Sequence, residues 1–273
     1  AARGFHAIHA LGAAPGACGT IGMSYFEVQE LSKDFDGLRA VDGFSSGFEQ
    51  GKVTSLIGPN GAGKTTVFNL MSGFLQATKG RVLYRGTDIT GMAPFKIVER
   101  GVARTFQDLR LFYHMTVQEN VLLGFQRQRE EKLVEAIFAR RRSRIERQEL
   151  GGRGADILRR LGLAAKSREL ARDLSYGEQK LLAIARAMAP DADVLLLDEP
   201  AAGLGRHAVE TILGVIRDLV KGGKTVLLID HHMEAVMGVS DWVIVLDAGK
   251  KIAEGPPEQV QHNDEVIKVY LGL

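Results

Sequence analysis

Cysteine and long apolar runs are nearly absent from this sequence of 273 residues. The one cysteine, Cys18, excludes an internal disulfide and makes a reducing compartment plausible. The longest apolar runs, such as Val194–Leu197 and Val243–Leu246, have the length of β-strands. Because a membrane-spanning helix needs roughly 20 apolar residues, we expect no segment that crosses a membrane by itself.

A marked excess of charge is also missing. The formal net charge of +2 gives no general argument for nucleic acid or an anionic membrane as a partner. The segment over 130–148 is rich in arginine, but glutamates are interleaved with the arginines. This mixed pattern favours a solvated helix face over a nucleic-acid surface, so we expect no nucleic-acid partner.

Residues 1–22 differ in composition from the rest of the chain. They are rich in alanine and glycine, contain no acidic residue and precede Met23. A targeting leader is one interpretation, and an extension that is disordered or not native is the one that the composition favours. We therefore place the folded domain at residues 23–273.

Short apolar runs alternate with helical segments along most of the chain, which predicts an α/β fold with a mainly parallel sheet. The expected strands are Lys52–Ile57, Arg81–Tyr84, Val194–Leu197, Thr225–Ile229 and Trp242–Leu246. Two earlier segments, Phe26–Leu31 and Val41–Phe48, alternate apolar and polar residues, which indicates an antiparallel β-subdomain.

The pattern becomes wholly helical between Thr116 and about Ala189. Thr116 and Glu119 form a capping box that predicts a helix over 117–123. Glycines at 151, 152 and 154 predict a break before another helix over 155–161. We therefore expect an all-helical subdomain, over about 112–189, inserted into the α/β core.

A glycine-rich loop between a strand and a helix predicts a phosphate site. Its residues fit G-x-x-x-x-G-K-[ST]: Gly58, Pro59, Asn60, Gly61, Ala62, Gly63, Lys64 and Thr65, followed by Thr66. The glycines let backbone N–H groups converge on phosphate oxygens at a helix N-terminus. Lys64 would contact the β- and γ-phosphates and the Thr65 hydroxyl would bind Mg2+. A glycine-rich turn without a ligand is the alternative, which the full match to the motif between a strand and a helix disfavours.

Two carboxylates follow the apolar strand Val194–Leu197. Asp198, at the strand end, is placed to orient Mg2+ directly or through water. Glu199, one residue later, could polarise the attacking water as a general base. Such a pair often only marks where a strand reaches solvent, and the phosphate loop upstream is what favours the catalytic interpretation.

The segment Leu174–Glu178 decides among the classes of phosphate-loop proteins. Ser175 and Glu178 form a capping box, which many helices have, but a serine-capped helix N-terminus is also an anion site. Ser175, Gly177 and Glu178 resemble the signature motif of ABC ATPases, with Tyr176 in place of the usual glycine.

Other segments fit this resemblance. Gln107, in Arg104–Gln107, resembles the glutamine that senses Mg2+ and the membrane subunit. His231, after the strand Thr225–Ile229, resembles the switch histidine, and its register with the strand favours it over His232. Phe35 matches the aromatic residue that stacks on adenine, although taken singly it is more typical of a core residue.

The resemblance covers Tyr25–Leu273 and is strongest to the ATP-binding subunits of branched-chain amino acid importers; importers of urea or short amides share much of it. The segments that carry it are Phe68–Phe74, Asp88–Gly91, Ala103–Gln107, Arg110–Phe112, Met115–Val121, Leu174–Glu178 and Val269–Gly272. It implies ATP and Mg2+ as ligands and a phosphate-loop core with both subdomains. It also implies a second ATPase subunit in a homodimer or heterodimer, membrane permeases and, indirectly, an extracytoplasmic binding protein. The implied location is peripheral, at the cytoplasmic face of the inner membrane.

Two other classes of protein have to be considered, and one position departs from the family pattern. A non-transport ABC protein of translation or DNA repair usually has two ATPase domains or a long coiled coil, and neither is present. A small phosphate-loop kinase is disfavoured by Glu199, His231 and the signature segment together. Where the family carries Asn or Asp after Ala201–Leu204, this chain has Gly205, which puts inter-subunit signalling in question.

An apolar cluster follows Gln107 over Phe106–Met115, and it has two interpretations. It includes Leu109, Leu111, Phe112, Tyr113 and Met115. Its position at the edge of the helical subdomain suggests a socket for a permease helix, and burial in the core is an equal alternative.

Overall fold

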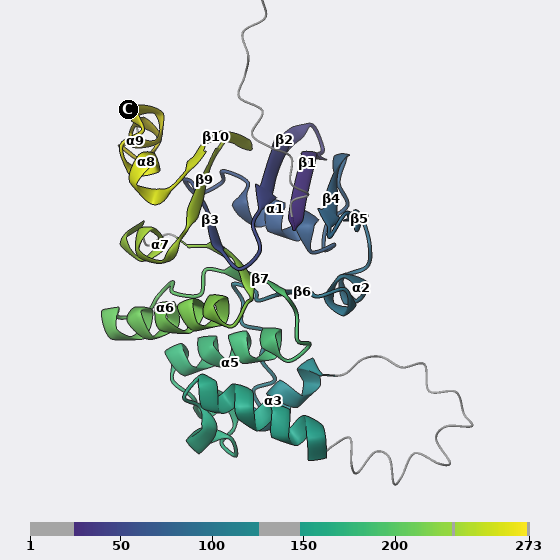
Figure 1. Ribbon diagram of the computed structural model, residues 1–273, viewed down its shortest axis with the longest axis vertical. Helices are drawn as coiled ribbons and strands as arrows, with labels where there is room; N and C mark the ends of the chain where they lie inside the picture. Colours follow the sequence, from purple (N-terminus) through teal and green to yellow (C-terminus); the bar gives the residue numbers. More distant parts are fainter. Residues whose placement is uncertain (1–24, 126–147, 231–232, 272–273) are drawn as a thin grey trace, which may run out of the picture.

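The computed structural model describes residues 25–125, 148–230 and 233–271 (Figure 1). The expectations for residues 1–22, for most of the arginine-rich segment and for His231 and His232 lie outside the described residues.

A six-stranded sheet forms the centre of the protein, with strand order β10-β9-β3-β8-β7-β6. The strands are β3 (Val53–Ile57), β6 (Val102–Arg104), β7 (Val194–Asp198), β8 (Thr225–Ile229), β9 (Trp242–Asp247) and β10 (Lys250–Gly255). All neighbours pair in parallel except β10, which runs antiparallel to β9. The predicted parallel sheet is confirmed, and its carboxyl ends bring the phosphate loop after β3 and the carboxylates after β7 to the same edge.

The central sheet is buried on both faces, which explains why its strands are continuous apolar runs. Along β7, Leu195 and Leu197 pack in one core cluster, whereas Val194 and Leu196 pack in the other. The first cluster includes helices α5 (Tyr176–Met188) and α6 (Arg206–Lys221), and the second includes α1 (Lys64–Met71). Therefore α1 and α5 lie on opposite faces of the sheet.

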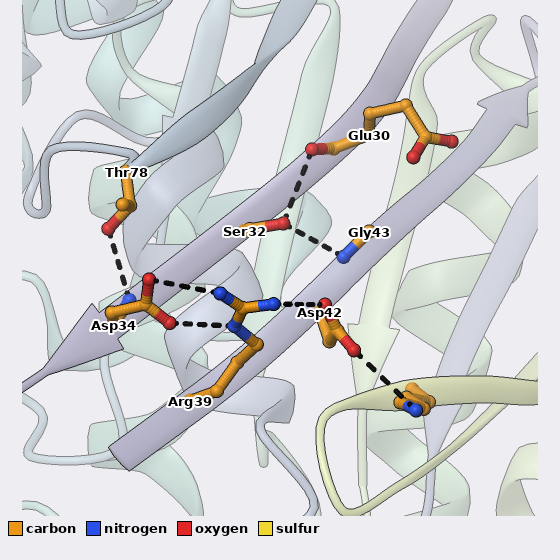
Figure 2. A network of polar contacts seen from close by, with 8 residues as sticks. Glu30, Ser32, Asp34, Arg39, Asp42, Gly43 and Thr78 are labelled. Atoms are coloured by element: carbon orange, nitrogen blue, oxygen red, sulfur yellow. Dashed lines mark hydrogen bonds and ion pairs between the residues drawn. The ribbon is translucent and has the colours of Figure 1, made fainter. Parts of the chain in front are cut away.

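A four-stranded antiparallel sheet packs against the α1 side. The sequence predicts such a subdomain, but it counts Arg81–Tyr84 with the parallel strands, whereas this segment pairs antiparallel with Phe26–Phe35. Its order is β2-β1-β4-β5. The strands are β1 (Phe26–Phe35), β2 (Leu38–Phe48), β4 (Lys79–Tyr84) and β5 (Thr87–Asp88). Polar contacts fix the β1–β2 hairpin: Arg39 pairs with Asp34 at 2.8 Å and with Asp42 at 3.0 Å, and the backbone N–H of Asp34 donates to Thr78 Oγ1 at 3.0 Å (Figure 2).

The remaining described helices cover the edges of this core. They are α2 (Pro94–Glu99), α3 (Val117–Gly124), α7 (Met233–Val239), α8 (Pro257–Gln261), α9 (Asp264–Leu271) and a helix over 148–160. Figure 1 shows α3 and α5 at the end of the molecule away from the four-stranded sheet. In the described residues no helix has the length and apolar character needed to span a membrane.

One secondary-structure prediction in the helical region is wrong. The helix over 148–160 continues through Gly151, Gly152 and Gly154 instead of breaking there. Each glycine costs about 1 kcal/mol relative to alanine in a helix interior, but tertiary packing overrides this preference. Gly154 packs beside α3 and its C-cap, where an added Cβ would lie in ordinary contact, 3.7 Å from Val121, Leu122 and Phe125. The capping box of Thr116 and Glu119 is present as predicted.

Candidate nucleotide-binding and hydrolysis site

The phosphate loop needs its glycines for backbone conformation and for space. Gly58, Gly61 and Gly63 have φ of +148°, +83° and +98°, which side chains disfavour. A Cβ on Gly63 would lie 2.5 Å from the Ala40 carbonyl oxygen, and a Cβ on Gly58 would overlap the carbonyl of Leu246. The loop therefore lies against β2 on one side and the end of β9 on the other.

Helix α1 begins at Lys64 with an N-terminus suited to an anion. Its N-cap, Gly63, supplies no side-chain cap, and its first turn contains no acidic residue. The first backbone N–H groups and the helix dipole thus remain directed at a ligand. Lys64 is 6% exposed, and its Nζ donates to the carbonyls of Gly58 and Pro59 at 2.8 Å each.

The charge of Lys64 is set by burial and by the two carboxylates. Burial lowers the pKa of Lys64, and the charges of Glu199 and Asp198 oppose this by favouring the ammonium form. The two carboxylates at the end of β7 therefore act electrostatically on the lysine of the phosphate loop.

Asp198 forms a buried ion pair that the sequence does not predict. Arg104 Nη2 lies 2.7 Å from Asp198 Oδ2, and the two side chains are 5% and 1% exposed. Arg104 Nη1 also donates to Asn69 Oδ1 at 2.6 Å and Ser72 Oγ at 3.0 Å, on α1 and its C-cap. Arg104 thus joins β6, β7 and α1 at the site.

Glu199 is held in an uncommon backbone conformation. Its φ is +49°, which is unfavourable for a residue with a side chain. Its backbone N–H donates to the Ile229 carbonyl at 2.8 Å, and Gln107 Nε2 donates to Glu199 Oε2 at 3.1 Å. The structure therefore brings together Gln107 and Glu199, which are far apart in the sequence.

The signature residues lie at the start of α5. Ser175 is the N-cap, and its hydroxyl and Glu178 form the predicted capping box. Lys166 Nζ pairs with Glu178 Oε1 at 2.8 Å, which adds a cation beside the cap. Since α5 and α1 lie on opposite faces of the sheet, Ser175, Gly177 and Glu178 form an element separate from the phosphate loop.

Phe35 lies at the end of β1 and is 40% exposed, so it is not a core residue. Lys33 Nζ lies 5.0 Å from the centroid of its ring. The network of Figure 2 fixes the strands that carry this aromatic ring. His231 is outside the described residues, but the preceding Asp230 is buried and accepts from the Ala201 backbone N–H at 3.0 Å.

Sequence reasoning missed a buried lysine on α5. Lys180 is 3% exposed, and its Nζ donates to the Glu199 carbonyl at 2.5 Å. It shares a helical stripe with Ala183, Ile184 and Ala187, all of which are buried. A lysine on an otherwise apolar stripe is the pattern that could have identified it.

The C-terminal helix also reaches the phosphate loop. Burial raises the pKa of Tyr270 on α9 to about 12, and a hydrogen bond with the Gly58 backbone opposes this rise. No feature of the sequence predicts this contact, because it depends on how α9 packs after β10.

The donor set at the site is compatible with Mg2+. Thr65, Gln107 and Asp198 offer a hydroxyl, an amide and a carboxylate, which are the oxygen ligands that this ion prefers. Among the described residues, no group of three or more His, Cys, Asp or Glu side chains could hold a metal ion. A single carboxylate fits an ion that is bound mainly through substrate phosphates and water.

Comparisons with known proteins agree with this geometry. Residues 41–202 match the ABC transporter family, and residues 250–272 match the branched-chain amino acid ATP-binding cassette transporter family. The high-affinity branched-chain amino acid transport ATP-binding protein BraF of Pseudomonas aeruginosa is 42% identical over 250 residues, covering 90% of this chain and 97% of BraF. LivG of Escherichia coli, which has the same description, is 41% identical over 246 residues, covering 90% of this chain and 96% of LivG.

A solved structure has the same fold. The crystal structure of a nucleotide-free ATP-binding cassette from an ABC transporter superposes with a TM-score of 0.81 at 32% identity, covering 92% of this chain and 100% of that chain. Fold and site together define a phosphate-loop ATPase. The chain belongs to the ABC transporter family. The predictions of family, fold class and ATPase activity are thereby confirmed.

Proposed function

We propose that this chain is the ATP-hydrolysing subunit of an importer for branched-chain amino acids. The observation that carries the proposal is the match of residues 250–272 to the branched-chain amino acid cassette family, at the end of a chain that aligns with BraF and LivG over nearly their whole length. The cargo is inferred from BraF and LivG, which are described as branched-chain amino acid transport proteins, because an ATPase subunit acts on nucleotide and not on the transported molecule.

In this proposal different residues of the site bind the phosphates, hold the metal ion, activate water and contact the adenine. Residues 58–66 and the N-terminus of α1 hold the phosphates, and the Lys64 ammonium neutralises their charge. Thr65, Gln107 and Asp198 would hold Mg2+, which supplies further neutralisation of phosphate charge when bound. Glu199 orients and deprotonates the attacking water, assisted by His231, and the exposed ring of Phe35 stacks on adenine.

The proposal includes a dimer of ATPase subunits, of two copies or of two different chains. Ser175, Gly177 and Glu178 lie on the helical side of the sheet, away from α1 of the same chain. A serine-capped helix N-terminus is an anion site, and in the dimer it would contact the nucleotide held by the partner. ATP would then favour the closed dimer, and hydrolysis would reopen it.

The permease would dock beside Gln107, at the cytoplasmic face of the inner membrane. A cleft of about 200 Å3 opens between β6, α3 and α5, and its lining includes Phe106, Leu109 and Arg110. The apolar cluster over Phe106–Met115 divides between core and surface: Leu111 is 7% exposed, whereas Phe112 and Tyr113 are 48% and 43% exposed. The surface part is the portion available to a partner.

An uptake assay tests the proposal. The chain would be co-purified with the permeases encoded by neighbouring genes, reconstituted in liposomes with a binding protein, and supplied with ATP. We expect ATP-dependent uptake of leucine, and loss of uptake in Lys64→Ala because a phosphate-binding charge is deleted. Uptake of urea or a short amide in place of leucine would refute the cargo, and association with ribosomes in place of permeases would refute the transport role.

A further inference from the structure

A buried lysine joins the signature helix to the catalytic turn. Lys180 lies in the second turn of α5, and its Nζ donates to the backbone carbonyl of Glu199 at 2.5 Å. The lysine comes from the helix that Ser175 caps, whereas Glu199 follows β7 in the central sheet. The bond therefore connects two elements with different proposed tasks.

The environment of Lys180 is built for a charged group. Burial lowers the pKa of Lys180, and the charges of Asp230, Glu199 and Asp198 oppose this. The Tyr176 ring centroid lies 5.3 Å from Nζ, so an aromatic face adds a further favourable contact. A methionine would fill this apolar stripe without the desolvation cost of a buried ammonium, so packing alone does not explain a lysine.

The carbonyl that Lys180 contacts belongs to a residue whose backbone needs restraint. Glu199 has a φ of +49°, and such conformations persist only where the surroundings determine them. The backbone N–H of Glu199 is held by Ile229 of β8. Lys180 holds the carbonyl on the other side of the same residue, and Gln107 Nε2 contacts the carboxylate itself at 3.1 Å.

The N-terminal end of α5 also contacts the segment after Glu199. A Cβ added to Gly203, which has a φ of +76°, would lie 3.3 Å from the Tyr176 ring, and a Cβ added to Gly177 would lie 3.7 Å from Leu204. A displacement of the signature end of α5 would therefore move both Lys180 and the turn over 199–205.

We propose that Lys180 is a positioning residue, which orients Glu199 for hydrolysis and couples that orientation to the position of the signature helix. The inference rests on the proposed role of Glu199 as general base. In a dimer, the nucleotide that contacts Ser175 would then influence the Glu199 of the same chain, and hence hydrolysis at the other site.

The test measures ATP hydrolysis and KM on the assembled transporter. Lys180→Met keeps the length of the side chain and removes the charge, and we expect kcat to fall roughly 10- to 100-fold, as for small displacements of catalytic groups, with KM within about twofold. Lys180→Arg, which keeps a cationic donor, should recover most of the rate. Lys224→Met is the matched control, because Lys224 pairs with Asp191 and does not contact the site.

A double variant separates positioning from a structural role. In the Glu199→Gln background, measured in single turnovers, Lys180→Met should cause little further loss, because the group that it orients is already removed. A full loss in that background, or a parental kcat in Lys180→Met, would overturn the proposal. If Lys180→Met does not fold, Lys180→Gln replaces it, because glutamine keeps a neutral hydrogen-bond donor. We expect Lys180→Gln to lower kcat severalfold at unchanged KM. A parental kcat in Lys180→Gln would also overturn the proposal.

Failure of the underlying function would give a different result. Glu199→Gln would then hydrolyse ATP at the parental rate, whatever the result at Lys180. A normal Lys180→Met beside an inactive Glu199→Gln removes only the positioning role.

Discussion

Arg104 contacts Asp198 through an ion pair of 2.7 Å in which both side chains are almost fully buried. The pair joins two adjacent parallel strands, β6 and β7, at the edge where the site forms. Further hydrogen bonds from the same guanidinium to Asn69 and Ser72 connect this edge to the phosphate-binding helix. The contacts of Arg104 therefore fix the direction of the Asp198 carboxylate.

Arg104→Met should lower the free energy of unfolding by about 3 kcal/mol or more, because it leaves a buried carboxylate without its cation. Chemical denaturation measures this change. Adding Asp198→Asn should recover part of the loss, since the uncompensated charge is then gone. Arg85→Met is the control: Arg85 pairs with Asp193 at 2.9 Å but is 54% exposed, so the loss should stay within about 1 kcal/mol. Equal losses in the two variants would contradict this account.

Glu199→Gln should preserve ATP binding and stop turnover, because the amide has the shape of the carboxylate but cannot accept the proton of water. With ATP and Mg2+, the variant should therefore accumulate as a dimer. Size-exclusion chromatography detects the dimer, and Lys64→Ala, which weakens nucleotide binding itself, should remain monomeric under the same conditions. Hydrolysis at the parental rate in Glu199→Gln would remove this residue from the catalytic role.

The cap of α5 should depend on pH. Burial raises the pKa of Glu178, but Lys166 and Ser175 lower it more, so the net shift is downward. A lowered pKa in the folded state stabilises the protein above the unfolded pKa of about 4.3 and ceases to do so as the pH falls through the folded value.

Glu178→Gln should therefore lower Tm by a few degrees at pH 7, as expected for loss of roughly 1 kcal/mol. The difference from the parent should shrink as the pH falls through the lowered folded-state pKa of Glu178. Thermal unfolding from neutral to acid pH measures it, with Glu99→Gln, on the exposed end of α2, as a control variant outside the cap of α5. A difference that is constant with pH would show that the carboxylate charge does not stabilise the cap.

Gly205→Asn should be accommodated and should raise the ATPase rate of the isolated chain. Gly205 is the N-cap of α6, with φ of −72° and no side-chain cap, and a Cβ there would meet nothing within 4 Å. Asparagine would add a cap, a gain of a few tenths of a kcal/mol. By the family resemblance it would also restore a group that reaches the partner.

Rates of the parent and Gly205→Asn, each alone and with a second ATPase subunit, distinguish these effects. We expect the parent alone to be slow and to gain from the second subunit, and the variant alone to be severalfold faster. An unchanged rate for the isolated variant would mean that backbone groups carry the contact.

The sequence predicts the fold well where local patterns decide it. Each of these patterns depends on only a few neighbouring residues. They are the apolar runs of β3, β7 and β8, the glycines of the phosphate loop and the capping boxes at Thr116 and Ser175. Their relative placement follows from a general rule, because parallel strands bring their carboxyl ends to one edge.

The contacts that the sequence does not predict involve partners far apart in the chain. Arg104 meets Asp198 only because β6 and β7 are neighbours, and Lys180 meets Glu199 only because α5 packs on the sheet. In the helix over 148–160 a local pattern gives a wrong prediction, because its glycines predict a break that packing against α3 overrides.

The carbonyl of Ala40 rests where a side chain on Gly63 would have to lie. Because a backbone carbonyl makes this contact, from a residue more than 20 positions away in the sequence, position 63 requires glycine whichever side chain residue 40 carries. A side chain at 63 would require the hairpin or the phosphate loop to shift. Grafting the phosphate loop alone into another scaffold would therefore transfer an incomplete site, and the β1–β2 hairpin would have to be transferred together with the loop.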